Sequence, residues 1–241
     1  MKRIGILTCG KVREDLVAAH GEYPAMFSRL LKAVDPALIT TPYRIYDNEY
    51  PRHIDDNEAY LISGSRYSVY DPDPWIGRLE DYVRELHAVR KPTVGICFGH
   101  QMMARALGGA TAEAPQGWGI GKHMAELIKV PEWMQPAAAR YGVFVSHQDQ
   151  VVTLPAGAQQ LARNAHCPNS MFVVDECFLG IQGHPEFTGE FARDLAAGRA
   201  EIYGEKTLAA AMATYDLPVD SVLVARWILQ FLTRAAAARK A

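Results

Sequence analysis

The sequence predicts an α/β protein in which helices cover both faces of a mainly parallel, mixed sheet, giving three layers. Short apolar runs alternate with amphipathic segments through the first hundred residues, a pattern typical of β-α-β units. Several of these runs are apolar at almost every position, as expected for strands buried on both faces. The 241 residues, 49% hydrophobic and 22% charged, can fill a large core.

The first half of the chain supplies the parallel strands and their helices. The first strand is expected at Arg3–Leu7, and a second strand is expected to end at Arg44–Tyr46. Two more strands are expected at Ala59–Ser63 and Thr93–Ile96. Helices are expected at Tyr23–Ala33, at Trp75–Val89 and from Phe98 onward. A polar loop is expected between the first strand and the first helix. Two proline-containing segments flank the second helix and favour loops there: Asp71-Pro72-Asp73-Pro74 before it and Lys91-Pro92 after it.

The second half changes character after Gly108-Gly109. Short extended pieces continue the sheet at Ala125–Val130, Tyr141–Val145, Gln159–Ala162, Met171–Val174 and Phe178–Gln182, and helical patterns follow at Gly189–Tyr203, Thr207–Thr214 and Val219–Ala238. We expect residues 1–204 to form the main domain and residues 205–241 a helical extension packed on it. The last helix is apolar enough either to close this core or to form a dimer contact.

A cysteine between two glycines is the most informative local pattern. Cys97 follows the strand Thr93–Ile96 and precedes a helix, with Gly95 and Gly99 two residues to either side. Such glycines allow a sharp strand-to-helix turn, and a helix N-terminus favours the thiolate. Cys97 is therefore a candidate nucleophile.

A nucleophilic thiol needs a base and a group that orients the base, and Gly183-His184-Pro185-Glu186 supplies both. Residues two apart in an extended segment point to the same side, so His184 and Glu186 can lie together. The chain order is nucleophile, base, acid, which differs from the nucleophile, acid, base order of α/β hydrolases. The alternative is a surface histidine and a carboxylate near a helix start.

These two motifs together resemble the class I, triad-type glutamine amidotransferases. Gly95-Ile96-Cys97-Phe98-Gly99-His100-Gln101 and Gly183-His184-Pro185-Glu186 are similar to the two signatures of that family and stand in the family's order. The resemblance covers about residues 4–187. It implies the flavodoxin-like fold of that family, a catalytic triad of Cys97, His184 and Glu186, and a cysteinyl thioester intermediate.

The resemblance also implies the remaining site residues. An oxyanion hole is expected from the N–H groups of Gly64 and Phe98, with Ser65 as a second candidate donor and a substrate-binding residue. Most members have glycine and proline where this chain has Ser65 and Arg66. Gln101 is expected to hold the amino-acid end of a glutamyl substrate, helped by the segment containing Ser146 and His147.

Several interpretations of the activity stay open. The chain resembles stand-alone members, including γ-glutamyl peptidases and proteins similar to the glutaminase part of GMP synthase, so hydrolysis of glutamine or a small γ-glutamyl compound is expected. The alternatives are a glutaminase subunit that delivers ammonia to a separate synthase, a free amidotransferase, and a catalytically idle binding protein of the same fold. The loops Arg66–Tyr70 and Gln116–Gly121 are expected to surround the leaving group.

Composition narrows the partners. The formal net charge is −2 and the sequence has no long block of basic residues, so no nucleic acid is expected as a partner. No apolar stretch suggests a membrane span or a signal peptide. We therefore expect a cytoplasmic protein with a small-molecule substrate, and a synthase partner or a homodimer. Four scattered cysteines form no disulfide framework, and no metal or other cofactor is expected.

Overall fold

The computed structural model describes residues 1–240, and its centre is a nine-stranded mixed sheet. Five neighbouring strands are parallel: β2 (Ile39–Arg44), β1 (Arg3–Thr8), β3 (Ala59–Ile62), β4 (Thr93–Ile96) and β11 (Phe178–Ile181). The sheet continues with antiparallel pairs: β10 (Met171–Val174), β9 (Gln159–Arg163), β6 (Gly119–Leu127) and β7 (Arg140–His147). A small second sheet pairs β5 (Ala110–Glu113) with β8 (Asp149–Thr153).

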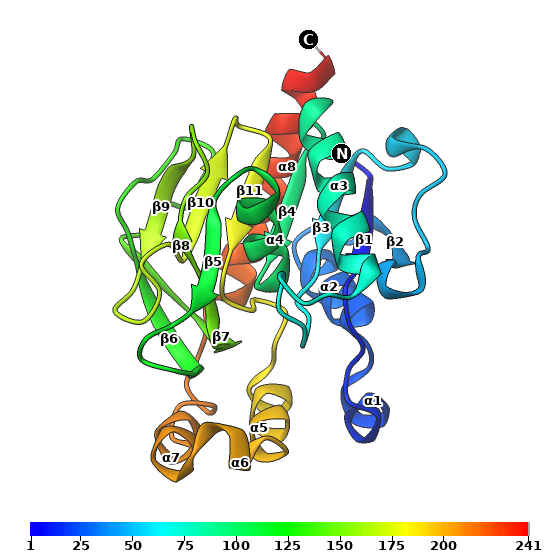
Figure 1. Cartoon of the computed structure of the whole chain (residues 1–241). Helices are drawn as coiled ribbons and strands as arrows, with labels where there is room; N and C mark the ends of the chain where they lie inside the picture. Colours follow the sequence, from blue (N-terminus) through cyan, green and yellow to red (C-terminus); the bar gives the residue numbers. More distant parts are fainter. Residues whose placement is uncertain (241) are drawn as a thin grey trace.

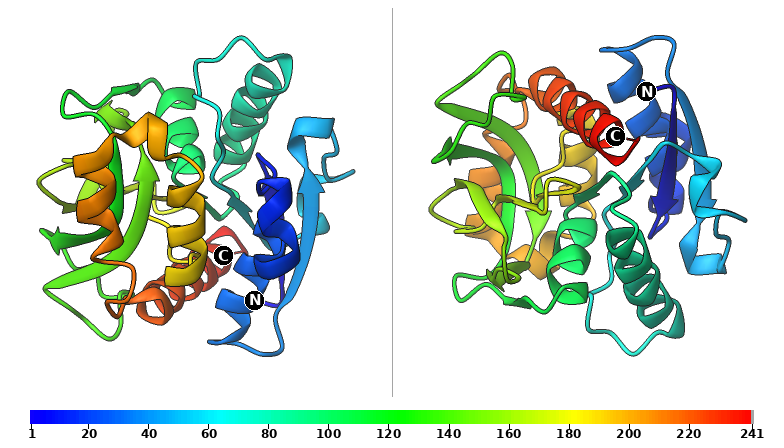
Figure 2. Two further views of the ribbon diagram at one scale, coloured as in Figure 1. Left: turned by 90° about the horizontal axis from the view of Figure 1, so that it is seen from below. Right: turned by 90° about the horizontal axis from the view of Figure 1, so that it is seen from above.

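Two pairs of helices cover the parallel part and complete the three expected layers. Figure 2 shows α3 (Pro74–Ala88) and α4 (Phe98–Ala106) on one face, and α2 (Tyr23–Lys32) and α8 (Ser221–Lys240) on the other. The apolar residues of α3 recur at helical spacing, and Ile76, Leu79 and Val83 are buried. In α8 the apolar side chains, Trp227 among them, join the same core as α2.

The other helices lie beyond the carboxyl ends of the parallel strands. Figure 1 shows α1 (Glu14–His20), α5 (Gly189–Ala197), α6 (Ala200–Tyr203) and α7 (Glu205–Met212) at this end of the molecule. The Thr188 hydroxyl accepts a hydrogen bond from the N–H of Phe191 and so caps α5. These helices form a rim around the edge where loops follow the parallel strands. None of the helices within residues 1–240 has the length and apolarity needed to cross a membrane.

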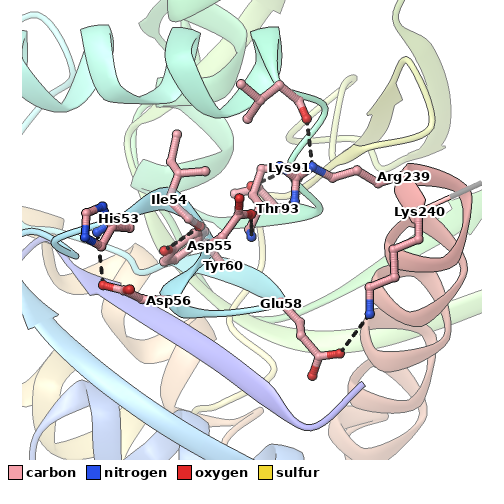
Figure 3. A network of polar contacts seen from close by, with 11 residues as sticks. His53, Ile54, Asp55, Asp56, Glu58, Tyr60, Lys91, Thr93, Arg239 and Lys240 are labelled. Atoms are coloured by element: carbon pink, nitrogen blue, oxygen red, sulfur yellow. Dashed lines mark hydrogen bonds and ion pairs between the residues drawn. The ribbon is translucent and has the colours of Figure 1, made fainter.

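A polar network ties α8 to the opposite end of the sheet (Figure 3). The side chain of Lys91 is only 2% exposed, and its ammonium lies 2.9 Å from the Asp55 carboxylate, which also accepts from Arg239 at 2.7 Å. Burial lowers the pKa of Lys91, while Asp55 opposes that shift. Asp55 therefore compensates a buried charge.

Replacement of Asp55 by alanine is expected to destabilise the fold, because it leaves the buried Lys91 ammonium without its carboxylate. We expect a loss of about 1–3 kcal/mol in the free energy of unfolding, measured by denaturant titration. Asp81→Ala is the control, since Asp81 is 75% exposed and pairs with the exposed Arg84. Equal midpoints for the two variants would contradict this role of Asp55.

The expected α/β class and layer order are confirmed, but several local predictions are wrong. The second strand ends at Arg44, because residues 45–47 form a 3₁₀ turn. The strand expected at 125–130 begins at Gly119 and ends at Leu127, since antiparallel pairing with β7 extends through its glycine-rich start. The helix expected at 189–203 divides at Gly198 into α5 and α6. The polar loop after β1 contains α1, and β5 and β8 were not predicted.

Candidate active site

The turn from β4 into α4 places Cys97 in a strained backbone conformation. Its φ of 52° and ψ of −102° are unusual for a residue with a side chain. A Cβ on Gly95 would lie 2.4 Å from the Gly99 carbonyl oxygen, and a Cβ on Gly99 would lie 2.4 Å from the Ile62 carbonyl oxygen. Both glycines are therefore required for the close approach of strand and helix that holds the thiol at the end of the sheet.

His184 and Glu186 follow β11, the strand next to β4, and both are buried. Nδ1 of His184 lies 2.7 Å from Oε1 of Glu186. The imidazole also stacks on Phe187 at 4.0 Å between ring centroids, and the backbone N–H of His184 donates to the Phe144 carbonyl. Glu186 and Phe187 thus hold the ring, and the Cys97 sulfur is close enough to raise its pKa.

The charges of this cluster favour a protonated imidazole. Burial alone would lower the pKa of His184, but the Glu186 carboxylate and the Cys97 sulfur together raise it above its ordinary value. Two other buried histidines behave oppositely. Burial lowers the pKa of His100 to about 4 and that of His147 to about 3. Among these three, only His184 is arranged to carry a proton at neutral pH.

This contrast is testable by pH titration. Between pH 5.5 and 7.5 we expect ¹⁵N-histidine NMR to show His184 as an imidazolium and His100 and His147 as neutral rings. The folded pKa values of the latter two lie below the unfolded value, so their contribution to stability is present above about pH 6.5 and is lost as the pH falls toward 4. Histidine-to-glutamine variants assign the signals. A neutral His184 ring at pH 7.5 would contradict the prediction.

Three backbone N–H groups lie around the thiol without protein acceptors. Within residues 1–240, the N–H groups of Gly64, Ser65 and Phe98 donate to no backbone or side-chain oxygen. A Cβ on Gly64 would lie 2.8 Å from Cε1 of His184 and 3.7 Å from Cβ of Cys97, so the turn after β3 packs directly on the pair. Such free donors beside a nucleophile suit an oxyanion.

A pocket of about 140 Å³ opens over Cys97, and all the expected substrate-binding residues line it: Ser65, Gln101, Ser146 and His147. The amide nitrogen of Gln101 donates to the Asp149 carbonyl at 2.8 Å and to Oε1 of Gln182 at 3.1 Å. Both of its hydrogens are therefore used, and only its carbonyl oxygen is left for a ligand.

The other three residues are likewise held by the protein. The Ser65 hydroxyl donates to the Cys9 carbonyl at 2.7 Å, and Nδ1 of His147 donates to the Asp149 carbonyl at 2.9 Å. The Ser146 hydroxyl lies 3.3 Å from the hydroxyl of Tyr203 in α6. Their side chains shape the pocket, and the surfaces they turn toward it are available for a ligand.

The loops expected around the leaving group are partly at the pocket. Tyr67 and Trp118 line it, whereas the Tyr70 hydroxyl donates to the Asp149 carboxylate at 2.8 Å and fixes the loop. Arg199, at the turn between α5 and α6, also lines the pocket and was not predicted. Its position depends on how the rim helices return over the site, and no local sequence pattern indicates it.

Metal ligation has no candidate in the described part of the chain. Across residues 1–240, no group of three or more histidine, cysteine, aspartate or glutamate side chains is arranged to hold a metal ion.

Comparison with known proteins identifies relatives of this site and fold. The family model for glutamine amidotransferase class-I matches residues 27–194, which include Cys97, His184 and Glu186. Gamma-glutamyl peptidase 4 of Arabidopsis thaliana is 32% identical over 183 residues, covering 73% of this chain and 72% of the relative. A glutamine amidotransferase-like protein of Schizosaccharomyces pombe is 28% identical over 244 residues, covering 95% and 98%.

Two further matches show the range of architectures. GMP synthase of Thermomicrobium roseum is 31% identical over 168 residues, which cover 68% of this chain but 30% of that protein. The crystal structure of a glutamine amido transferase from Methylobacillus flagellatus superposes with a TM-score of 0.75 at 22% identity, covering 99% of this chain and 95% of the other. With the family model matching most of its length, the chain belongs to the class-I glutamine amidotransferase family.

Proposed function

We propose that this protein hydrolyses the γ-glutamyl amide bond of glutamine or a small γ-glutamyl compound, through a thioester on Cys97. The strained Cys97 beside the buried His184–Glu186 pair carries the proposal. The small volume of the pocket, about 140 Å³, favours a small substrate. The gamma-glutamyl peptidases among the relatives support a γ-glutamyl bond as the target.

In the proposed first half-reaction, the Cys97 sulfur attacks the γ-carbonyl carbon, and the oxygen becomes an oxyanion held by the N–H groups of Gly64 and Phe98. The C–N bond then breaks, and His184 gives its proton to the departing ammonia or amine. The product on the enzyme is a γ-glutamyl thioester. The raised pKa of His184 favours this step because the ring holds the proton that the leaving group requires.

In the second half-reaction, neutral His184 removes a proton from water, which attacks the thioester carbon. The C–S bond breaks, glutamate leaves, and Cys97 and His184 return to their starting states. Oε1 of Glu186 lies 2.7 Å from Nδ1 of His184, and through this contact Glu186 is proposed to fix the ring and stabilise the imidazolium. The carbonyl oxygen of Gln101 and the backbone near Ser146 and His147 are proposed to hold the ammonium end of the glutamyl group.

Stand-alone activity is proposed in preference to a subunit role, and the gamma-glutamyl peptidases of Arabidopsis thaliana among the relatives support it. We assign catalysis to residues 1–204 and a supporting role to the helical extension 205–241, since α8 fills the core shared with α2. The GMP synthases among the relatives keep the glutaminase-subunit alternative in view.

The test is glutamate release from glutamine and from glutathione by the purified protein alone. Release without an added protein is the expected result, together with labelling of Cys97 by a glutamine-analogue electrophile. Release that requires a synthase would identify an ammonia-delivering subunit. The absence of both release and labelling would leave a binding protein of this fold.

A further inference from the structure

Arg199 is the one cationic side chain of the pocket that, within residues 1–240, has neither a hydrogen-bond or ion-pair partner nor an aromatic ring to lie on. The Asp149 carboxylate accepts from the hydroxyls of Ser68 and Tyr70. The Arg66 guanidinium donates to the hydroxyl of Tyr67 and lies over that ring. Within residues 1–240, the half-buried guanidinium of Arg199 forms no ion pair and donates to no side chain or carbonyl.

The remaining carboxylate of the pocket does not neutralise Arg199. Glu113 is exposed at the pocket edge and forms no ion pair in the part of the chain that the structure describes. The charge of Arg199 is close enough to the buried Tyr23 to oppose the rise in the pKa of that phenol, which burial causes. Arg199 therefore presents a positive charge at a partly desolvated wall, where an anionic ligand gains most from a guanidinium.

Arg199 reaches the pocket from a different element than Gln101. Gln101 lies one turn along α4 from Cys97 and is bonded to the Asp149 carbonyl. Arg199 comes instead from the rim, at the start of α6, whose Tyr203 packs edge-on against Trp118 at 5.1 Å between ring centroids and lies 3.3 Å from the Ser146 hydroxyl. The packing on Trp118, the aromatic residue expected beside the leaving group, is the contact that favours the leaving group as the partner of Arg199.

We propose that Arg199 selects γ-glutamyl substrates whose leaving group carries a carboxylate, that is, γ-glutamyl amino acids and peptides, over glutamine. The inference rests on the proposed hydrolase function of Cys97 and specifies its substrate class. Ammonia, the leaving group of glutamine, offers nothing for a guanidinium to bind. An amino-acid leaving group offers two carboxylate oxygens that match the guanidinium fork.

The experiment compares kcat/KM for γ-glutamylglycine with kcat/KM for γ-glutamyl methylamide, which lacks the second carboxylate. The wild-type ratio is expected to be at least about 10, and Arg199→Met is expected to lower it by about 10–100-fold. Arg199→Lys is expected to give an intermediate ratio. Arg193→Met is the matched control, because Arg193 lies on the neighbouring helix and pairs with Asp216 at 2.6 Å, outside the pocket.

An unchanged ratio in Arg199→Met would overturn the inference. That includes an equal loss on both substrates, which would place Arg199 on the α-carboxylate of the glutamyl group instead. These outcomes are separate from failure of the proposed function, which would appear as no hydrolysis of either substrate by the wild type and no electrophile labelling of Cys97. Thermal unfolding of each variant confirms that the ratio is measured on folded protein.

Discussion

Replacing Cys97 by alanine is expected to lower the rate of glutamate release by at least about 10⁴-fold, because the Cys97 sulfur is the proposed nucleophile that forms the thioester. The measurement is a coupled glutamate assay with glutathione and glutamine. Stability should change little, since alanine and cysteine bear the same backbone strain at a φ of 52°. Loss of activity with an unchanged unfolding midpoint separates chemistry from folding.

Cys177→Ala is the control for this variant, since Cys177 is also buried and close to β11. Burial raises the pKa of Cys177 to about 11 and that of Cys167 to about 12, so both remain thiols at neutral pH. We expect Cys177→Ala to retain full activity and alkylation by iodoacetamide to occur at Cys97. Substantial activity in Cys97→Ala would contradict the proposed nucleophile.

A glycine at the same position distinguishes strain from chemistry. Cys97→Gly is expected to be as inactive as Cys97→Ala. Its free energy of unfolding is expected to be about 1 kcal/mol larger than that of Cys97→Ala, because glycine adopts a positive φ without a steric penalty. The energy stored in this turn is the cost of placing the sulfur beside His184.

The fold class was predictable because its signals are local. The apolar runs of β1, β3 and β4 and the helical spacing in α3 are visible within a few residues of sequence. The elements that were missed depend on distant partners. β5 is largely exposed and is defined by its pairing with β8, which begins at residue 149, so its own sequence carries no strand pattern.

The same distinction holds in the candidate site. The glycines around Cys97 and the spacing of His184 and Glu186 predicted the local geometry of each motif, because the backbone is continuous within it. The pairing of Cys97 with His184, 87 residues further along the chain, was implied by the family resemblance. The sequence could not predict that the amide hydrogens of Gln101 are used up, because the Asp149 carbonyl that accepts one of them is 48 residues away in the chain. Arg199 was missed for the same reason.

Gly64→Ala is the second variant with a large expected effect, because Gly64 is the point where the oxyanion turn touches the catalytic pair. A Cβ there would lie 2.8 Å from Cε1 of His184, a distance that real Cβ atoms essentially never show. The imidazole cannot retreat, since it is bonded to Glu186 and stacked on Phe187. Either the ring or the donor N–H must shift.

A displacement of this size is expected to lower kcat/KM for γ-glutamyl substrates by about 10²–10³-fold, since both the base and the oxyanion donor lose their positions. Overpacking should also cost about 1–3 kcal/mol in the free energy of unfolding. Gly77→Ala is the control: in α3 its Cβ would meet nothing within 4 Å, so it should stabilise the fold by about 0.5–1 kcal/mol and leave activity unchanged. Near-wild-type kcat/KM in Gly64→Ala would show that the donor N–H and His184 do not act at the distance proposed, and the oxyanion would then have to be assigned to Ser65 and Phe98.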